Sequence, residues 1–201
     1  MNYAALNAKL SAIAAKPPNR NGHDAILQSA TNICRFIHTK PQRDFVMAMA
    51  QAAHDKNLHV YIIHWKRLSQ LDKHNHIVIK SILGAEIDLN NILWMYRLKR
   101  YHCVKGDATF GHLIPIRYML SRKATRRMAD CVTPKALLDE VASSPYALDF
   151  KSLADKGFEI QAGGPTPEQM LEKTILHRYQ AAARRFPNSL APALAYLKSI
   201  I

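Results

Sequence analysis

Several features that mark other classes of protein are scarce or absent in this sequence of 201 residues. Its three cysteines are far apart and form no CxxC pair, which argues against a disulfide framework or a structural zinc site and favours a reducing cytosol. No stretch approaches the roughly 20 apolar residues that a membrane span needs, and the N-terminus has no long apolar segment typical of a secretion signal. We therefore expect a protein that meets a membrane only through its surface or through a partner.

Acidic residues and glycine are also scarce. The 15 Asp and Glu residues stand against 28 Lys and Arg residues, so the formal net charge is +13 at neutral pH. This charge favours anionic partners such as nucleic acid, an anionic membrane surface or an acidic protein, and it does not choose among them. With only seven glycines and many Ala, Leu, Lys and Arg residues, the composition favours helices.

Hydrophobic periodicity predicts an all-α protein, a multi-helix bundle of roughly ten helices without a convincing pair of strands. Helix starts are predicted where a cap residue precedes a helix, at Asp72, at Ser121 and at Asn188, and where it precedes a first-turn proline, at Thr133-Pro134 and Thr166-Pro167. The last of these pairs is expected to start the longest helix.

The limits of other elements depend on competing signals. Residues 58–71 are rich in β-branched and aromatic side chains, so a strand competes there with a helix. Gly84 predicts a helix end, and Asp88 predicts the cap of the next helix. We expect N-terminal helices in 1–56, a central helical unit in 57–161 and C-terminal helices in 162–201.

The segment GAEIDLNNILWMYRLKRYH, residues 84–102, threads polar and basic groups through large apolar ones. On a helical wheel, two opposite apolar stripes appear: Leu89, Ile92, Leu93 and Tyr96 on one side, and Trp94, Leu98 and Tyr101 on the other. A surface helix has a single stripe, so this helix is expected in the middle of a bundle. Arg97 falls on the seam between the stripes and needs an acceptor, for which Glu86 and the carbonyls of a neighbouring helix end are natural candidates.

This segment resembles the GTEIDLxNLxWIYRxKxYY signature of the C/d (AC39-like) family of V-type and archaeal-type ATPase subunits. The resemblance extends to WKRLSQLDKHNHIVIKSIL upstream, to HLIPIRYMLSRKATRRMADC downstream and to FPNSLAPALAYL near the end. The chain departs from the family pattern at Ala85 and Ile116, where Thr and Gly are usual. Because only one EIDLxN element is present, we expect a fragment, a split subunit or a reduced paralogue.

Members of this family are all-helical, and their three similar domains form a funnel on the cytoplasmic mouth of a membrane rotor ring. The resemblance implies a non-catalytic connector that binds rotor-ring and central-shaft subunits and couples ATP hydrolysis to proton or sodium transport. It also implies a cytoplasmic location peripheral to the membrane and no catalytic, metal or cofactor-binding residue. The alternatives are an orphan helical scaffold of the same ancestry and a basic nucleic-acid-binding helical protein.

The candidate site residues are polar or basic groups that either clamp helices together or face a partner. They are Glu86, Asp88, Asn90, Asn91, Arg97, Lys99, Arg100, Arg122, Arg126 and Arg127. The run RKATRR makes a cationic helix face, so nucleic acid is the main rival partner, although no helix-turn-helix, zinc-finger or RNP pattern accompanies it. Enzyme activity has little support, because the sequence contains no HExxH or GxSxG motif and no phosphate-binding loop.

Overall fold

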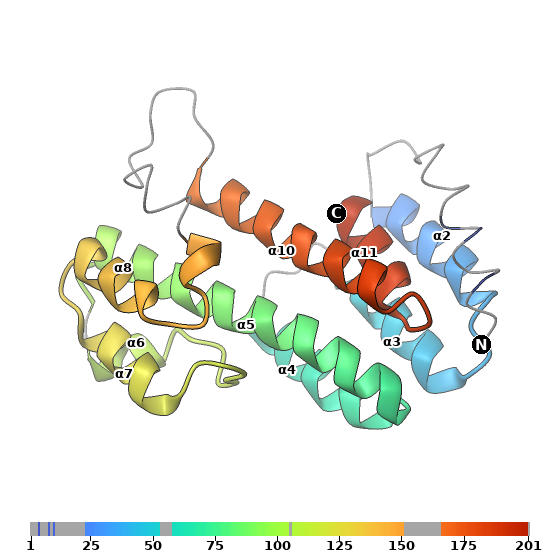
Figure 1. The fold of residues 1–201 in the computed structure, drawn as a ribbon, viewed down its shortest axis with the longest axis horizontal. Coiled ribbons are helices and arrows are strands. Elements are labelled where there is room, and N and C mark those ends of the chain that lie inside the picture. The colour runs from blue at the N-terminus through green and yellow to red at the C-terminus, as the bar shows by residue number, and fades with distance from the viewer. Residues whose placement is uncertain are drawn as a thin grey trace. The chain divides into compact units, whose positions relative to one another are not determined.

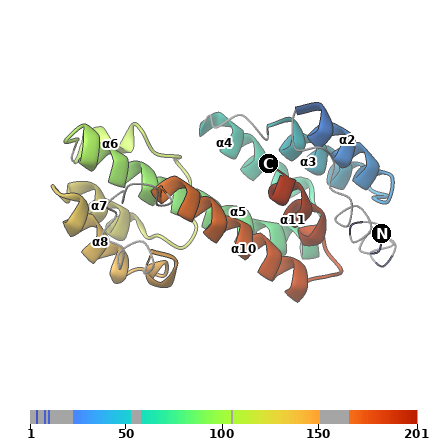
Figure 2. The same ribbon diagram turned by 90° about the horizontal axis from the view of Figure 1, so that it is seen from above.

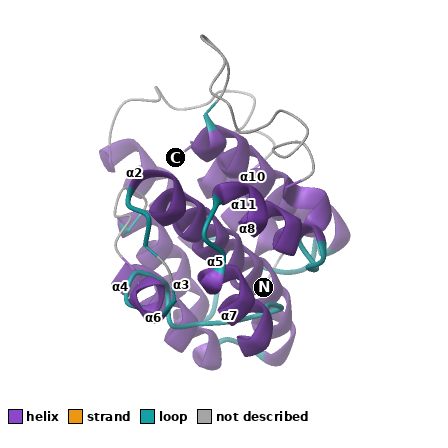
Figure 3. Cartoon of the chain, turned by 90° about the vertical axis from the view of Figure 1, so that its left-hand side faces the viewer, coloured by secondary structure: helices purple, strands orange, loops and turns teal. Residues whose placement is uncertain are grey.

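The computed structural model describes residues 4, 8, 10, 23–52, 58–104, 106–150 and 166–200. Within these ranges the regular elements are all helices and no strand occurs, as Figure 3 shows by colour, so the all-α prediction is confirmed. Residues 58–70 form helix α4 (Leu58–Arg67) and the 3₁₀ turn η1 (Leu68–Gln70) rather than the competing strand. No helix in the described part of the chain is long and apolar enough to cross a membrane.

The chain divides into two compact units. The first comprises Met1–Leu83 together with Leu176–Ile201, and the second comprises Gly84–Ile175. Two helices, α5 (Lys73–Tyr101) and α10 (Pro167–Arg185), contribute residues to both units. The three-part division expected from the sequence stays a prediction.

In the first unit, α2 (His23–Cys34) packs against α3 (Lys40–Gln51), and both contact α11 (Ala191–Ile200), as Figures 1 and 2 show. Asp72 caps α5, as predicted, because its carboxylate accepts a hydrogen bond from the backbone N–H of Asn75 at 3.1 Å. The Asn75 side chain in turn accepts from the backbone N–H of Leu190 at 2.7 Å, which fixes the chain just before α11. The predicted cap at Asn188 is wrong, because α11 begins at Ala191 and its first helical bond ends on the Leu190 carbonyl.

In the second unit, α6 (Asp107–Phe110), α7 (Arg122–Asp130) and α8 (Pro134–Ala142) gather around the C-terminal half of α5 (Figures 1 and 2). The predicted caps of α7 and α8 are confirmed. The Ser121 hydroxyl accepts from the Ala124 N–H, and the Thr133 hydroxyl accepts from the Ala136 N–H, both at 3.1 Å. Each bond satisfies an amide that the first turn of a helix leaves without a partner.

Helix α5 runs for 29 residues without a break, so the predicted helix end at Gly84 and the predicted cap at Asp88 are both wrong. It is also longer than α10, which has 19 residues and which the sequence predicts to be the longest helix. Gly84 serves a close approach instead: a Cβ there would lie 2.7 Å from the Cβ of Tyr118. The cost of a glycine inside a helix, about 1 kcal/mol, is offset by the packing that its missing side chain allows.

Burial along α5 confirms the expectation of a helix in the middle of a bundle. From Ile82 to Lys99, only Asn90, Trp94 and Arg97 are half-buried, and every other residue is buried. A helical segment without an exposed residue must pack against neighbours on more than one side. Polar side chains on this segment therefore lie inside the protein, where each needs a partner.

Candidate functional site

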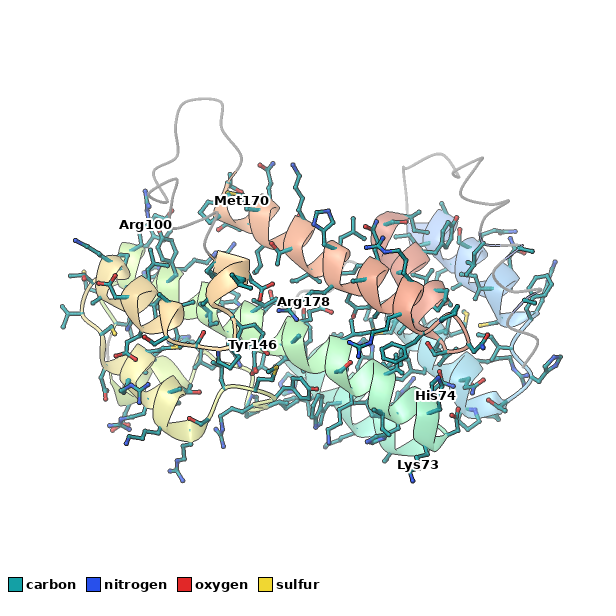
Figure 4. All side chains as sticks on the ribbon, in the orientation of Figure 1. Lys73, His74, Arg100, Tyr146, Met170 and Arg178 are labelled. Atoms are coloured by element: carbon teal, nitrogen blue, oxygen red, sulfur yellow. The ribbon has the colours of Figure 1, made fainter. Side chains whose placement is uncertain are left out.

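Asp88 lies at the centre of the buried polar groups on α5, with an exposed fraction of 0%. Its carboxylate accepts hydrogen bonds from three consecutive backbone N–H groups, those of Tyr118 at 3.1 Å, Met119 at 2.7 Å and Leu120 at 3.0 Å. The hydroxyl of Tyr146, which is labelled in Figure 4, donates a fourth bond at 2.8 Å. This one carboxylate therefore holds residues 111–121, which we call the clamped loop, against α5.

Asn91 holds the same loop one helical turn further along α5. Its side-chain amide donates to the Ile114 carbonyl at 3.1 Å, and its carbonyl oxygen accepts from the Ile114 N–H at 2.8 Å. The amide also reaches the Ile116 carbonyl at 3.4 Å. Residues three positions apart on a helix share a face, so Asp88 and Asn91 act on the loop together.

Lys99 ties α5 to the end of α7. The residue is 3% exposed, and its ammonium donates to the Ala129 carbonyl at 2.9 Å. A cation at this position satisfies a carbonyl in the last turn of a helix and interacts favourably with the helix dipole. Burial lowers the pKa of Lys99, an effect that the nearby Cys131 and Asp130 partly oppose.

Arg97 finds its acceptor on α10, so the predicted pairing with Glu86 is wrong. Two guanidinium nitrogens of Arg97 lie 2.7 and 2.8 Å from one carboxylate oxygen of Glu168, and the guanidinium also lies 5.1 Å from the centre of the Trp94 ring. Partial burial alone would raise the pKa of Glu168. Hydrogen bonds from its own backbone N–H, from Arg97 and from Thr166 outweigh that effect and hold the pKa below its ordinary value.

Three further candidates make contacts within α5. Glu86 is buried, and its backbone carbonyl accepts from the side-chain amide of Asn90 at 2.9 Å. Arg100 donates to the Tyr96 hydroxyl at 2.6 Å and lies over the Tyr96 and Tyr101 rings. The Tyr96 bond raises the pKa of the already basic Arg100. Asp88, Asn91 and Lys99 thus bond to groups outside α5, whereas Arg100 is exposed at the helix end.

The candidate residues on α7 border an open depression of about 950 Å³, which we call the basic groove. Its lining comes from α6, the clamped loop and α7 and consists of Asp107, Phe110, Arg117, Arg122, Lys123, Arg126 and Arg127. The lining thus contains five cationic side chains and one carboxylate. The periodicity of RKATRR predicts that α7 contributes a cationic face to this surface. Sequence reasoning misses Arg117 on the loop and Asp107 and Phe110 on α6, because only the folded loop brings them to α7.

Two of the five cations have acidic partners. Arg126 forms ion pairs with Asp107 and Asp130, and Arg127 pairs with Glu140 at 2.9 Å. The remaining cations, Arg117, Arg122 and Lys123, are exposed and form no ion pair with any residue that the structure describes. Their charges are therefore available to an anionic partner.

The described residues contain no group of three or more His, Cys, Asp or Glu side chains placed to hold a metal ion. A family model described as ATP synthase (C/AC39) subunit matches residues 44–200. No curated protein and no solved structure matches the chain. The matched region includes the clamps on α5, the basic groove and the caps described above.

Proposed function

The chain belongs to the ATP synthase (C/AC39) subunit family of the V/A-type ATPases, and on that basis we propose that it is a non-catalytic connector in a rotary ATPase. In this role it docks on the membrane rotor ring and on central-shaft subunits, and it couples ATP hydrolysis to proton or sodium transport. It then lies on the cytoplasmic face of the membrane without spanning it. The observation that carries the proposal is the family match, which extends over both the α5 signature and the segment before α11.

The packing of α5 supports a mechanical role. A part that transmits torque has to resist deformation, and a close-packed interior has low compressibility. No residue of α5 from Ile82 to Lys99 is exposed, and the hydrogen bonds that Asp88 accepts and that Asn91 and Lys99 donate fix its neighbours. These bonds join side chains of α5 to main-chain groups of the clamped loop and of α7. The helix and the loop are therefore expected to move together as one body.

The state of the buried acid supports a non-catalytic role. A general base needs a free lone pair within reach of a substrate proton. The Asp88 carboxylate already accepts four hydrogen bonds and is fully buried, so it is not open to a substrate. The presence of Asp88 in this segment is therefore accounted for by its structural hydrogen bonds.

The experiment that tests this proposal is an affinity purification of the tagged chain from native membranes solubilised in mild detergent. We expect the rotor-ring and central-shaft subunits of a V/A-type ATPase to copurify with it after nuclease treatment. Recovery of ribosomes or nucleic acid in their place would favour the nucleic-acid-binding alternative, for which the basic groove is the supporting observation. Recovery of neither would leave a helical scaffold outside the ATPase and would overturn the proposal.

A further inference from the structure

We propose that the basic groove binds an acidic segment of a polypeptide partner, with glutamate or aspartate side chains meeting Arg117, Arg122 and Lys123. This inference rests on the proposed function only for the identity of the partner, because the binding itself is a property of the groove. None of these three charges forms an ion pair with a residue that the structure describes, and all three side chains are exposed.

The position of two of the cations makes a purely structural role unfavourable. Arg122 and Lys123 are the first two residues of α7. The N-terminus of a helix carries a partial positive charge, so cations in the first turn destabilise a helix, whereas acids stabilise it. Arg126 contributes to the stability of the fold through its ion pairs with Asp107 and Asp130. Arg122 and Lys123 have no such pair with a described residue, and their charges destabilise the helix that carries them. A bound anion would relieve this repulsion.

The groove is held in one arrangement before any partner arrives. Arg117 directly precedes the three residues whose backbone N–H groups donate to Asp88, and Arg122 follows Ser121, which caps α7. The clamped loop and the start of α7, which carry the three unpaired cations, are therefore fixed by hydrogen bonds that do not involve those cationic side chains. Such preorganisation lowers the entropy that ordering a binding surface would otherwise cost.

The chemistry of the lining favours a polypeptide over a nucleic acid. Single-stranded nucleic acid is bound by cations together with open aromatic faces on which bases stack. The aromatic side chain of the groove, Phe110, has the Arg126 guanidinium 5.6 Å from its ring centre, so that face is already occupied. The aliphatic stems of the Arg and Lys side chains and the Phe110 ring instead suit a chain that alternates acidic and apolar side chains.

The lining also differs from a site for a free phosphate or a single lipid headgroup. Such sites converge several donors on one point, often backbone N–H groups or buried cations. Here the unpaired cations are exposed and come from two elements, the clamped loop and α7. Charges spread along a groove match an extended anionic segment better than a compact anion.

The test measures binding of a short fluorescein-labelled peptide, in which glutamates alternate with Leu and Ala, to the full chain by fluorescence anisotropy. A peptide with Gln in place of every Glu is the ligand control. The groove variant combines Arg117→Gln, Arg122→Gln and Lys123→Gln. The matched control combines Arg35→Gln, Lys173→Gln and Arg184→Gln, which removes the same charge from exposed positions outside the groove. Circular dichroism establishes that both variants fold.

We expect the groove variant to bind the acidic peptide about ten- to a hundredfold more weakly, because it removes three exposed ion pairs and each contributes a factor of roughly two to five. The control variant should bind within about twofold of the wild-type chain, and the Gln peptide should not bind. Equal weakening in both variants would overturn the proposal, because it would show an effect of net charge alone. So would single-stranded DNA, inorganic phosphate or phosphatidylglycerol vesicles binding the groove where the acidic peptide does not.

The two proposals fail in different ways. If the acidic peptide binds in the groove but purification of the chain recovers no part of an ATPase, the proposed function fails and the chemistry of the groove stands. If ring and shaft subunits copurify equally well with the wild-type chain and the groove variant, and the peptide does not bind, the groove proposal fails and the proposed function stands.

Discussion

Replacing Asp88 with alanine removes the acceptor of four hydrogen bonds and tests whether this single carboxylate holds the clamped loop. Two of the donors, the N–H of Leu120 and the hydroxyl of Tyr146, make buried bonds, so water cannot replace the carboxylate there. Each buried donor without a partner costs about 1–3 kcal/mol. The N–H groups of Tyr118 and Met119 make partly buried bonds, and water takes them over at a cost of about 0.5 kcal/mol each.

These contributions sum to about 3–7 kcal/mol, and the removal of a buried charge, which no longer has to be desolvated, offsets part of that sum. We therefore expect Asp88→Ala to lower the free energy of unfolding by about 3–4 kcal/mol, a large share of the typical stability of a domain. The milder Tyr146→Phe removes one bond and leaves the carboxylate, so it should cost about 1 kcal/mol.

The assay is urea unfolding followed by tryptophan fluorescence in a Trp65→Phe background. The remaining tryptophan, Trp94, lies on α5 within the unit that contains Asp88, so its signal reports on that unit. Asp139→Ala on α8 is the control, because Asp139 is exposed, and it should change stability by less than about 0.5 kcal/mol. A loss below about 1 kcal/mol in Asp88→Ala would refute the reasoning, since it would place the stability of the loop in other contacts.

Further outcomes follow from other parts of the fold. Gly84→Ala should destabilise the chain by about 1–3 kcal/mol despite the better helix propensity of alanine, and a raised melting temperature would contradict the close approach of Tyr118. Ser121→Ala and Thr133→Ala should each cost about 1 kcal/mol in urea unfolding, and an unchanged midpoint would show that the caps are dispensable. The pKa of Glu168 is lowered in the folded state, so its stabilisation is present above the unfolded pKa of about 4.5 and is lost as pH falls through the folded value. Urea midpoints of wild type and Glu168→Gln should therefore differ at neutral pH and converge in acid, and a constant difference down to the lowest pH would contradict this.

Features set by neighbouring residues could be predicted from the sequence. A hydroxyl followed three residues later by the amide that it accepts from is a local arrangement, which is why the caps at Ser121 and Thr133 are predictable. Of the two apolar stripes predicted for the 84–102 segment, the one that contains Leu89 and Ile92 is buried, because helical periodicity reports burial. In the other stripe Leu98 is buried, Trp94 is half-buried and Tyr101 is exposed, so that stripe is only partly confirmed. Both predictions depend on residues within one helix.

Features set by distant partners could not be read in this way. Gly84 carries a local stop signal, and only the packing of Tyr118, from the clamped loop, shows that the helix continues through it. Asp88 is a residue type that often caps helices. Its donors lie 30 or more residues further along the chain, and most of them are backbone N–H groups, which every residue except proline has and which a sequence therefore does not reveal. The acceptor of Arg97 is similarly remote, 71 residues away at Glu168.

The way in which Asp88 holds its loop has a consequence for how the protein tolerates substitution. The bonds end on main-chain N–H groups at positions 118–120, and every residue except proline supplies such a group. The exposed side chains beside them, such as Arg117 and Met119, are therefore not needed to keep the loop in place. Asp88 thus holds the loop through its main chain and leaves the exposed side chains of the loop without a role in keeping it in place. If the groove binds an acidic segment as proposed, its charges can therefore change to suit a different partner without loss of the hydrogen bonds that hold the loop.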